Sequence, residues 1–158
     1  MRYYAGVGSR NLPDRMAEQM QRVARHLSSL GYTLRSGGAK GADQAFESGA
    51  SPSKEIFYAS SATDISREFT KKFHPAPQAL HGYVLDLMAR NAYQVLGYTM
   101  NNPSDFLLCW TPDGCEEDAT RSRTTGGTGQ AISIASAYDV PVINLANDGW
   151  KDRLMKLI

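Results

Sequence analysis

The hydrophobic residues of this chain follow two spacings, and each spacing predicts a different kind of element. Short apolar runs bounded by glycine or polar residues are typical of buried strands, whereas apolar residues that recur with a period of about 3.6 are typical of helices. The runs predict strands at residues 2–7, 32–36, 54–59, 105–110 and 141–145. The helical spacing predicts helices at residues 13–30, 42–50, 80–96, 128–138 and 150–157. Residues 60–78 are expected to form a partly helical excursion across one rim.

Strands and helices alternate from one end of the sequence to the other. This alternation is typical of an α/β domain in which helices cover both faces of a mostly parallel sheet. At this length we expect a single domain, residues 1–158, with one core. Ligands of such domains bind outside the carboxyl ends of the strands. Polar loops with glycines follow predicted strands at residues 6–10, 36–43 and 111–129, so we expect all of them at that edge.

The loop with the sequence SGGAKGAD is the strongest of these motifs. Its glycines expose backbone N–H groups, and the helix that follows directs its positive end toward the same place, which is a typical way to bind phosphate. Asp43 has two interpretations, because it either interacts with the helix dipole or binds a ribose hydroxyl. The GxxxxGK[ST] and GxGxxG spacings are absent. The residues expected to bind ligand here are Ser36, Gly37, Gly38, Lys40, Gly41 and Asp43.

The other two loops repeat parts of this arrangement. GVGSR near the N-terminus is either a tight turn that needs glycine or a ligand loop, in which Arg10 offers a guanidinium suited to phosphate. TTGGTGQAIS places hydroxyls and bare backbone at the start of a helix. The residues expected to bind ligand in these two loops are Gly8, Ser9, Arg10, Thr125, Gly126, Gly127, Thr128 and Gly129.

Two polar residues, Arg90 and Asn91, lie within the long helix expected at residues 80–96. They either belong to a solvated face or project into the cleft, where Arg90 would pair with a phosphate. A charged segment, CEEDATRSR, precedes the last glycine loop and is either solvated or functional. Its carboxylates include Glu116, and cleavage of an N-glycosidic bond needs such a group as acid or base.

Composition and charge narrow the classes of function. The formal net charge is +1, which gives no overall reason to favour DNA or a membrane surface as partner. The two cysteines, Cys109 and Cys115, are expected to be reduced thiols, and no spacing indicates a metal or cofactor site. The N-terminus lacks the apolar segment of a signal peptide, and no apolar run has the length of a membrane span. We therefore expect a cytoplasmic protein without metal or cofactor.

The order GSR, SGGAKGAD, RN, GGTGQAISIA and PVINL resembles the SLOG superfamily, over nearly the whole chain. This superfamily includes the DNA-processing protein A family (DprA, also called SMF), the YspA-like proteins and the LONELY GUY hydrolases, and the motifs are most similar to the DprA and YspA-like branch. The resemblance implies a Rossmann-like three-layer αβα sandwich that binds nucleotides or nucleotide-derived ligands. It also implies a homodimer or higher homo-oligomer, paired through helices beside the cleft.

The hydrolase branch carries a PGGxGTxxE motif with a catalytic glutamate. Here Ser133 stands at that position and Gln130 replaces the threonine. A phosphoribohydrolase would therefore need another carboxylate, for which the candidates are Asp43, Glu47, Glu116 and Glu117, with Asp43 and Glu116 foremost.

Three functions follow, in order of preference. The first is a nucleotide-binding sensor or sequestering protein. The second is a nucleotide N-glycosidase that uses a non-standard carboxylate. The third, less favoured because of the near-zero net charge, is a compact single-stranded DNA binder with cations and aromatic rings along one groove. The residues that would line such a groove are Arg10, Lys40, Arg67, Lys71, Arg121 and Arg123, with Tyr98 or Trp110 for stacking.

Overall fold

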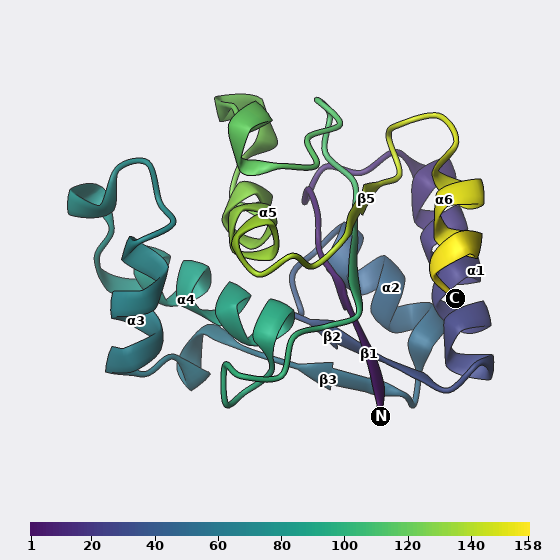
Figure 1. Cartoon of the computed structure of the whole chain (residues 1–158), viewed down its shortest axis with the longest axis horizontal. Coiled ribbons are helices and arrows are strands. Elements are labelled where there is room, and N and C mark those ends of the chain that lie inside the picture. The colour runs from purple at the N-terminus through teal and green to yellow at the C-terminus, as the bar shows by residue number, and fades with distance from the viewer.

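Five parallel strands form one sheet in the computed structural model, which describes residues 1–158 (Figure 1). The strands are β1 (Arg2–Gly6), β2 (Tyr32–Ser36), β3 (Lys54–Ile56), β4 (Phe106–Cys109) and β5 (Val142–Asn144). Their order across the sheet is β3-β2-β1-β4-β5, and every neighbouring pair is parallel. The predicted α/β fold is confirmed, and the sheet is parallel throughout.

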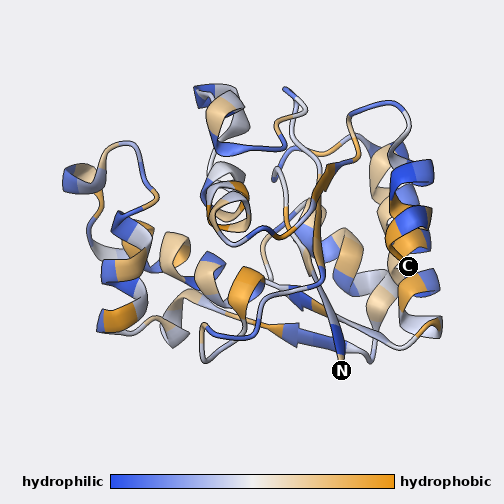
Figure 2. Ribbon diagram, in the orientation of Figure 1, coloured by the Kyte–Doolittle hydropathy of each residue, from blue (hydrophilic) through white to orange (hydrophobic).

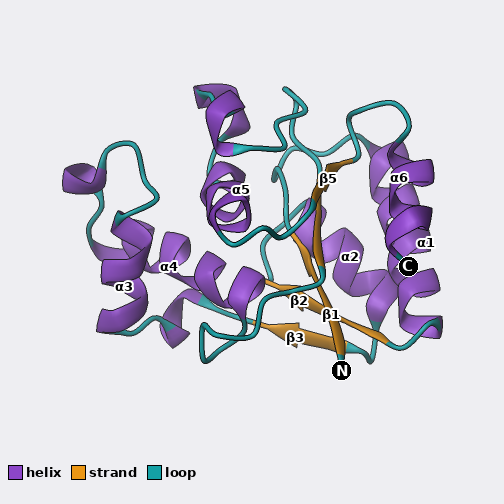
Figure 3. Ribbon diagram, viewed as in Figure 1, coloured by secondary structure: helices purple, strands orange, loops and turns teal.

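Helices cover both faces of the sheet, so the fold has three layers (Figures 1 and 3). To the right of the sheet in Figure 1 lie α1 (Asp14–Ser29), α2 (Ala42–Ala50) and α6 (Trp150–Leu157). To its left lie α4 (Gly82–Leu96) and α5 (Thr128–Ala137), and α3 (Asp64–Lys71) packs against α4. This arrangement is the expected Rossmann-like αβα sandwich.

The sheet divides the buried apolar residues into two clusters, where the sequence had suggested one core. Successive strand residues point to opposite faces, so Phe106 and Leu108 pack against α1 and α2 while Leu107 packs against α4 and α5. In Figure 2, orange colours β5 and parts of α4, α5 and α6, which all contribute residues to these clusters. A fully buried apolar sheet explains the unbroken apolar run of β4.

Several elements are shorter than the spacing predicted. The third strand was expected over residues 54–59, but β3 ends at Ile56 and a 3-10 turn spans Ala59–Ser61. The helix expected from residue 80 begins at Gly82, because Leu80 ends a second 3-10 turn at Pro77–Ala79. The excursion at residues 60–78 is partly helical, as predicted, and contains α3.

The strand order places a crevice at the middle of the sheet. The chain moves from β1 outward to β3 and then returns to the other side of β1 with β4. At such a reversal the loops after the two central strands diverge to opposite faces and leave a ligand site between them. None of the helices combines the length and the apolar character that crossing a membrane requires.

Candidate functional site

The three glycine-bearing loops meet at the carboxyl edge of the sheet around a cavity of about 370 Å³. We call this cavity the cleft. A second cavity of about 610 Å³ shares Arg10, Ala39 and Arg90 with it. The cleft is lined by residues 7–11, Ala39, Asp43, Leu87, Met88, Arg90, Asn91, Gln94 and residues 124–128. The second cavity adds Gly37, Gly38, Lys40, Tyr58, Ala59, Ser60 and Tyr83. The loops predicted to share one edge therefore do so.

The loop after β2 is held by a carboxylate beneath it. Glu47 Oε2 accepts hydrogen bonds from the Gly38 N–H at 2.9 Å and from the Ser36 hydroxyl at 2.5 Å. Ser36 is fully buried and lines neither cavity, so its hydroxyl supports the loop from below. Gly41 has a φ of +81°, and a Cβ there would meet the carbonyl oxygens of Ser9 and Arg10. Glycine is thus required where the first two loops touch.

Backbone N–H groups in these loops are left without acceptors. Those of Gly8, Lys40 and Gly127 donate to no group of the protein. Gly8 and Gly127 line the cleft, and Lys40 lines the second cavity. Gly127 is also the residue that precedes α5, so the positive end of that helix points to the same side. Free N–H groups at a helix N-terminus suit an anion.

Asp43 is the buried carboxyl group of the cleft. Its Oδ2 accepts the Ala39 N–H at 3.2 Å, and only 5% of the residue is exposed. Burial raises the pKa of Asp43 to about 7, although the Ala39 hydrogen bond and the nearby positive charge of Arg90 act in the opposite direction. The group therefore changes its protonation state near neutral pH. It can donate a hydrogen bond to a ligand when protonated and accept one when ionised.

Arg90 projects toward the cleft and not into a solvated face. Its Nη1 donates to the Gly37 carbonyl at 2.8 Å, while its buried Nε has no partner. It forms no ion pair. Asn91 is buried and also lines the cleft. The alternative in which both residues face solvent is excluded by this placement.

The loop before α5 is anchored by Asp113, which the sequence analysis missed. Asp113 Oδ2 accepts hydrogen bonds from the hydroxyls of Thr125 and Ser122, and Oδ1 accepts one from Thr111. Burial alone would raise the pKa of Asp113, but these hydroxyls lower it to about 2. Thr125 and Thr128 line the cleft. Gly129 does not, because the Arg121 side chain lies directly over it.

The other catalytic candidate, Glu116, does not lie at the cleft. Its Oε2 accepts the Asn144 N–H at 2.8 Å and an Arg153 guanidinium N–H at 2.7 Å. Burial would raise the pKa of Glu116, but these donors lower it below its ordinary value. The carboxylate thus ties its loop to β5 and α6, and it lines neither the cleft nor the second cavity.

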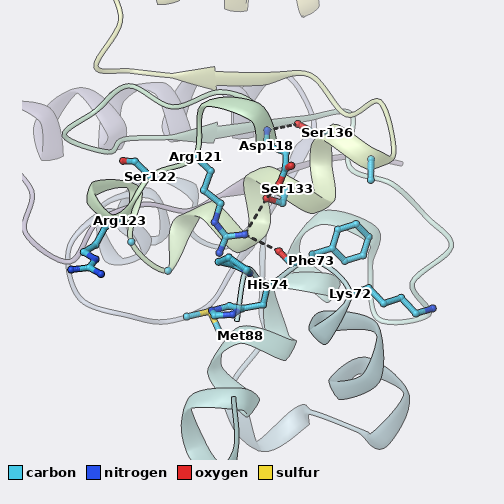
Figure 4. A pocket seen from close by; sticks show the side chains of 14 residues that line it. Lys72, Phe73, His74, Met88, Asp118, Arg121, Ser122, Arg123, Ser133 and Ser136 are labelled. Atoms are coloured by element: carbon cyan, nitrogen blue, oxygen red, sulfur yellow. Dashed lines mark hydrogen bonds between the residues drawn. The ribbon is translucent and has the colours of Figure 1, made fainter. Parts of the chain in front are cut away.

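A different carboxylate reaches the position where the resemblance implied a glutamate. The Ser133 hydroxyl donates to Asp118 Oδ1 at 2.6 Å and accepts from Arg121 Nη1 at 3.1 Å (Figure 4). These residues line a third cavity of about 950 Å³, next to the cleft. The sequence indicated Asp118 only as a member of a charged run, because the loop path that returns it to α5 is a tertiary feature.

Gln94 is a further residue of the cleft that the sequence analysis missed. It is buried, and neither polar atom of its side chain has a protein partner. Its spacing from Arg90 and Asn91 was the available indication, since residues three and four positions apart share one face of a helix.

Comparisons with known proteins bear on the fold. No protein-family model and no curated protein matches this sequence. Among solved structures, the chain is similar to DNA processing protein A from Helicobacter pylori, a structure described for its single-stranded DNA binding mode. The TM-score is 0.60 at 16% sequence identity, and the alignment covers 98% of this chain and 72% of the other. At this identity the similarity establishes that the two proteins share a fold.

Proposed function

We propose that the protein binds a nucleotide or nucleotide-derived ligand in the cleft, as a sensor or sequestering protein. The observation that carries this proposal is Arg90. Its guanidinium is half-buried, donates to the Gly37 carbonyl, keeps an Nε without a partner and lies beyond ion-pair distance of any carboxylate. A phosphate would supply an anion to this guanidinium through charge-assisted hydrogen bonds.

The remaining groups suit the rest of a nucleotide. The Gly8 N–H in the first loop and the Gly127 N–H at the start of α5 would donate to phosphate oxygens. Asp43 would accept a hydrogen bond from a ribose hydroxyl, which is one of the two interpretations that its sequence position left open. The structural likeness to DNA processing protein A and the order of the glycine motifs support a place in the DprA and YspA-like branch of the SLOG superfamily.

Isothermal titration calorimetry tests the proposal directly. The four 5′-mononucleotides, their nucleosides and inorganic phosphate are titrated into the protein. We expect at least one 5′-mononucleotide to bind and its nucleoside to bind much more weakly. The control is Arg25→Ala, which removes an exposed cation of α1 on the opposite layer and should change nothing. Equal affinity for a nucleoside and its monophosphate would exclude a phosphate site in the cleft.

Hydrolysis of the N-glycosidic bond is the alternative for the same cleft. It is supported by the Asp43 carboxyl group, whose pKa of about 7 suits a general acid or base near neutral pH. The binding function is preferred for two reasons. Glu116 accepts hydrogen bonds from Asn144 and Arg153 away from the cleft, and residue 133 is a serine instead of a glutamate.

Single-stranded DNA binding is the third candidate, and the likeness to DNA processing protein A, whose structure is described for its single-stranded DNA binding mode, favours it. Fluorescence anisotropy with a labelled oligothymidylate of about 10 nucleotides tests it. Affinity that falls steeply with salt and is lost in Arg90→Ala would support this function. Self-association, which the resemblance implied, stays a prediction that light scattering after size-exclusion chromatography would check.

A further inference from the structure

The cavity of about 950 Å³ beside the cleft has a strongly basic lining (Figure 4). We call it the basic cavity. It lies between the chain segment after α3, which contributes Lys72 and His74, and the loop before α5, which contributes Arg121 and Arg123. Asp118 is the only carboxylate among its lining residues. The cavity therefore carries an excess of positive charge.

The cations of the basic cavity have no ion-pair partner within the protein. None of Lys72, Arg121 and Arg123 forms an ion pair, whereas Arg67, Lys71 and Arg153 all do. His74 adds no charge near neutral pH, because burial and then the adjacent Arg121 lower its pKa. The Asp118 carboxylate accepts its hydrogen bond from Ser133 and lies beyond ion-pair distance of any cation. Asp118, whose negative charge acts on Arg121, therefore balances only part of this positive charge.

Arg121 is held in one orientation. Its Nη1 donates to the Phe73 carbonyl at 2.8 Å and to Ser133 Oγ at 3.1 Å, and Figure 4 shows the side chain extended between them. The absent side chain of Gly129 makes room for it. Its Nε and Nη2 have no protein acceptor and are not closed off from solvent. A fixed guanidinium with free N–H groups is well suited to a phosphate.

The basic cavity and the cleft are adjacent. Met88, Gly126 and Gly127 line both. From these observations we propose that the basic cavity binds a second phosphate group of the same ligand, attached to its sugar away from the first phosphate. The ligand class is then a nucleotide with two separated phosphates, such as a nucleoside 3′,5′-bisphosphate. This inference rests on the proposed nucleotide function of the cleft.

The test compares three sets of nucleotides by isothermal titration calorimetry. The probes are the 5′-monophosphates, the 3′,5′-bisphosphates and the 5′-diphosphates of the four common nucleosides. The diphosphates add the same kind of charge in a different place, so they separate position from charge. We expect a 3′,5′-bisphosphate to bind at least about tenfold more tightly than its 5′-monophosphate, and the 5′-diphosphate to gain less.

Variants locate the second phosphate. Arg121→Gln should remove the advantage of the bisphosphate and leave the affinity for the 5′-monophosphate unchanged. Because Arg121 also bonds to the Phe73 carbonyl, the exposed pair Lys72→Ala and Arg123→Ala provides a second variant that should reduce the advantage without disturbing the fold. Arg25→Ala is the matched control.

The outcomes distinguish the two proposals. The second phosphate site is excluded if 5′-monophosphates bind but 3′,5′-bisphosphates bind no more tightly, or if the 5′-diphosphates gain as much affinity as the bisphosphates. Either result leaves the proposal of nucleotide binding in the cleft intact. The second phosphate site is also excluded if the bisphosphate keeps its higher affinity both in Arg121→Gln and in the variant that combines Lys72→Ala with Arg123→Ala. If no nucleotide binds, the cleft proposal fails, and the second site fails with it.

Discussion

Replacement of Asp43 by asparagine should make the protein less sensitive to pH. The carboxyl group is buried, and its pKa is about 7 in the folded protein, against about 3.9 in an unfolded chain. Between these values the folded state keeps the proton that the unfolded state has released. The unfolded state is therefore increasingly favoured as the pH rises through this range, and the destabilisation is complete above about pH 7.

The magnitude follows from the size of the shift. Each unit of pKa difference corresponds to about 1.4 kcal/mol, so the group destabilises the fold by at most about 4 kcal/mol above neutrality. As the pH rises from about 5 to about 8, the free energy of unfolding should fall by about 2.5 kcal/mol because of this group. Asparagine has no charge to bury and still offers an oxygen to the Ala39 N–H. Asp43→Asn should therefore be more stable than the wild type at about pH 8.

Urea denaturation followed by circular dichroism at several pH values measures the effect. The quantity to compare is the free energy of unfolding of Asp43→Asn minus that of the wild type, because other carboxylates contribute equally to both. This difference should grow with pH between about pH 5 and pH 7. Asp148→Asn, at an exposed carboxylate without hydrogen-bond or ion-pair partners, is the control. Parallel profiles for Asp43→Asn and the wild type would refute the perturbed pKa and the role derived from it.

Three further predictions concern the cleft and the helix packing. Arg90→Ala should weaken nucleotide binding by about 1.5 to 3 kcal/mol in calorimetry, the range for a hydrogen bond to a charged group, and an unchanged affinity would make Arg90 a structural residue only. Chromatography of long incubations with the four 5′-mononucleotides should show little or no free base; rapid release that Asp43→Asn abolishes would instead establish the hydrolase. Gly49→Ala should lower the free energy of unfolding by about 1 to 3 kcal/mol in urea, because a Cβ there would overlap the Gln21 backbone of α1, whereas the exposed Ser48→Ala on the same helix should have little effect.

Part of the candidate site could be predicted because the topology leaves few choices. When parallel strands alternate with helices, the loops that follow the strands must lie at one edge of the sheet. Glycine loops at residues 8, 37–41 and 126–129 were thus expected together, and the structure places all three loops around two cavities that share lining residues, although Gly129 itself lines neither. The sequence did not decide whether Arg90 faces the cleft or the solvent, because a helix with polar residues near its apolar face has two compatible orientations.

Other assignments failed because a side chain's partner is far away in sequence. Ser36 was expected to bind ligand, but Glu47 on the following helix takes its hydroxyl. Glu116 was expected to be a candidate for catalysis, but the packing of α6 brings Arg153 to it. Asp118 had no distinct role until the loop before α5 returned it to Ser133. Each outcome depends on a contact that spacing does not encode.

The sequence by itself determined the order of the elements, the parallel sheet and the edge at which a ligand would bind, because hydrophobic periodicity and the connection rules act locally. Only the tertiary structure decided which polar groups are free to meet a ligand. A hydroxyl, carboxylate or guanidinium is available for binding only when the fold has not already supplied its partner, and those partners lie 11 residues away for Ser36 and 37 for Glu116. Arg90 and Arg121 retain unpaired donors for the same reason: no carboxylate lies within ion-pair distance of either guanidinium.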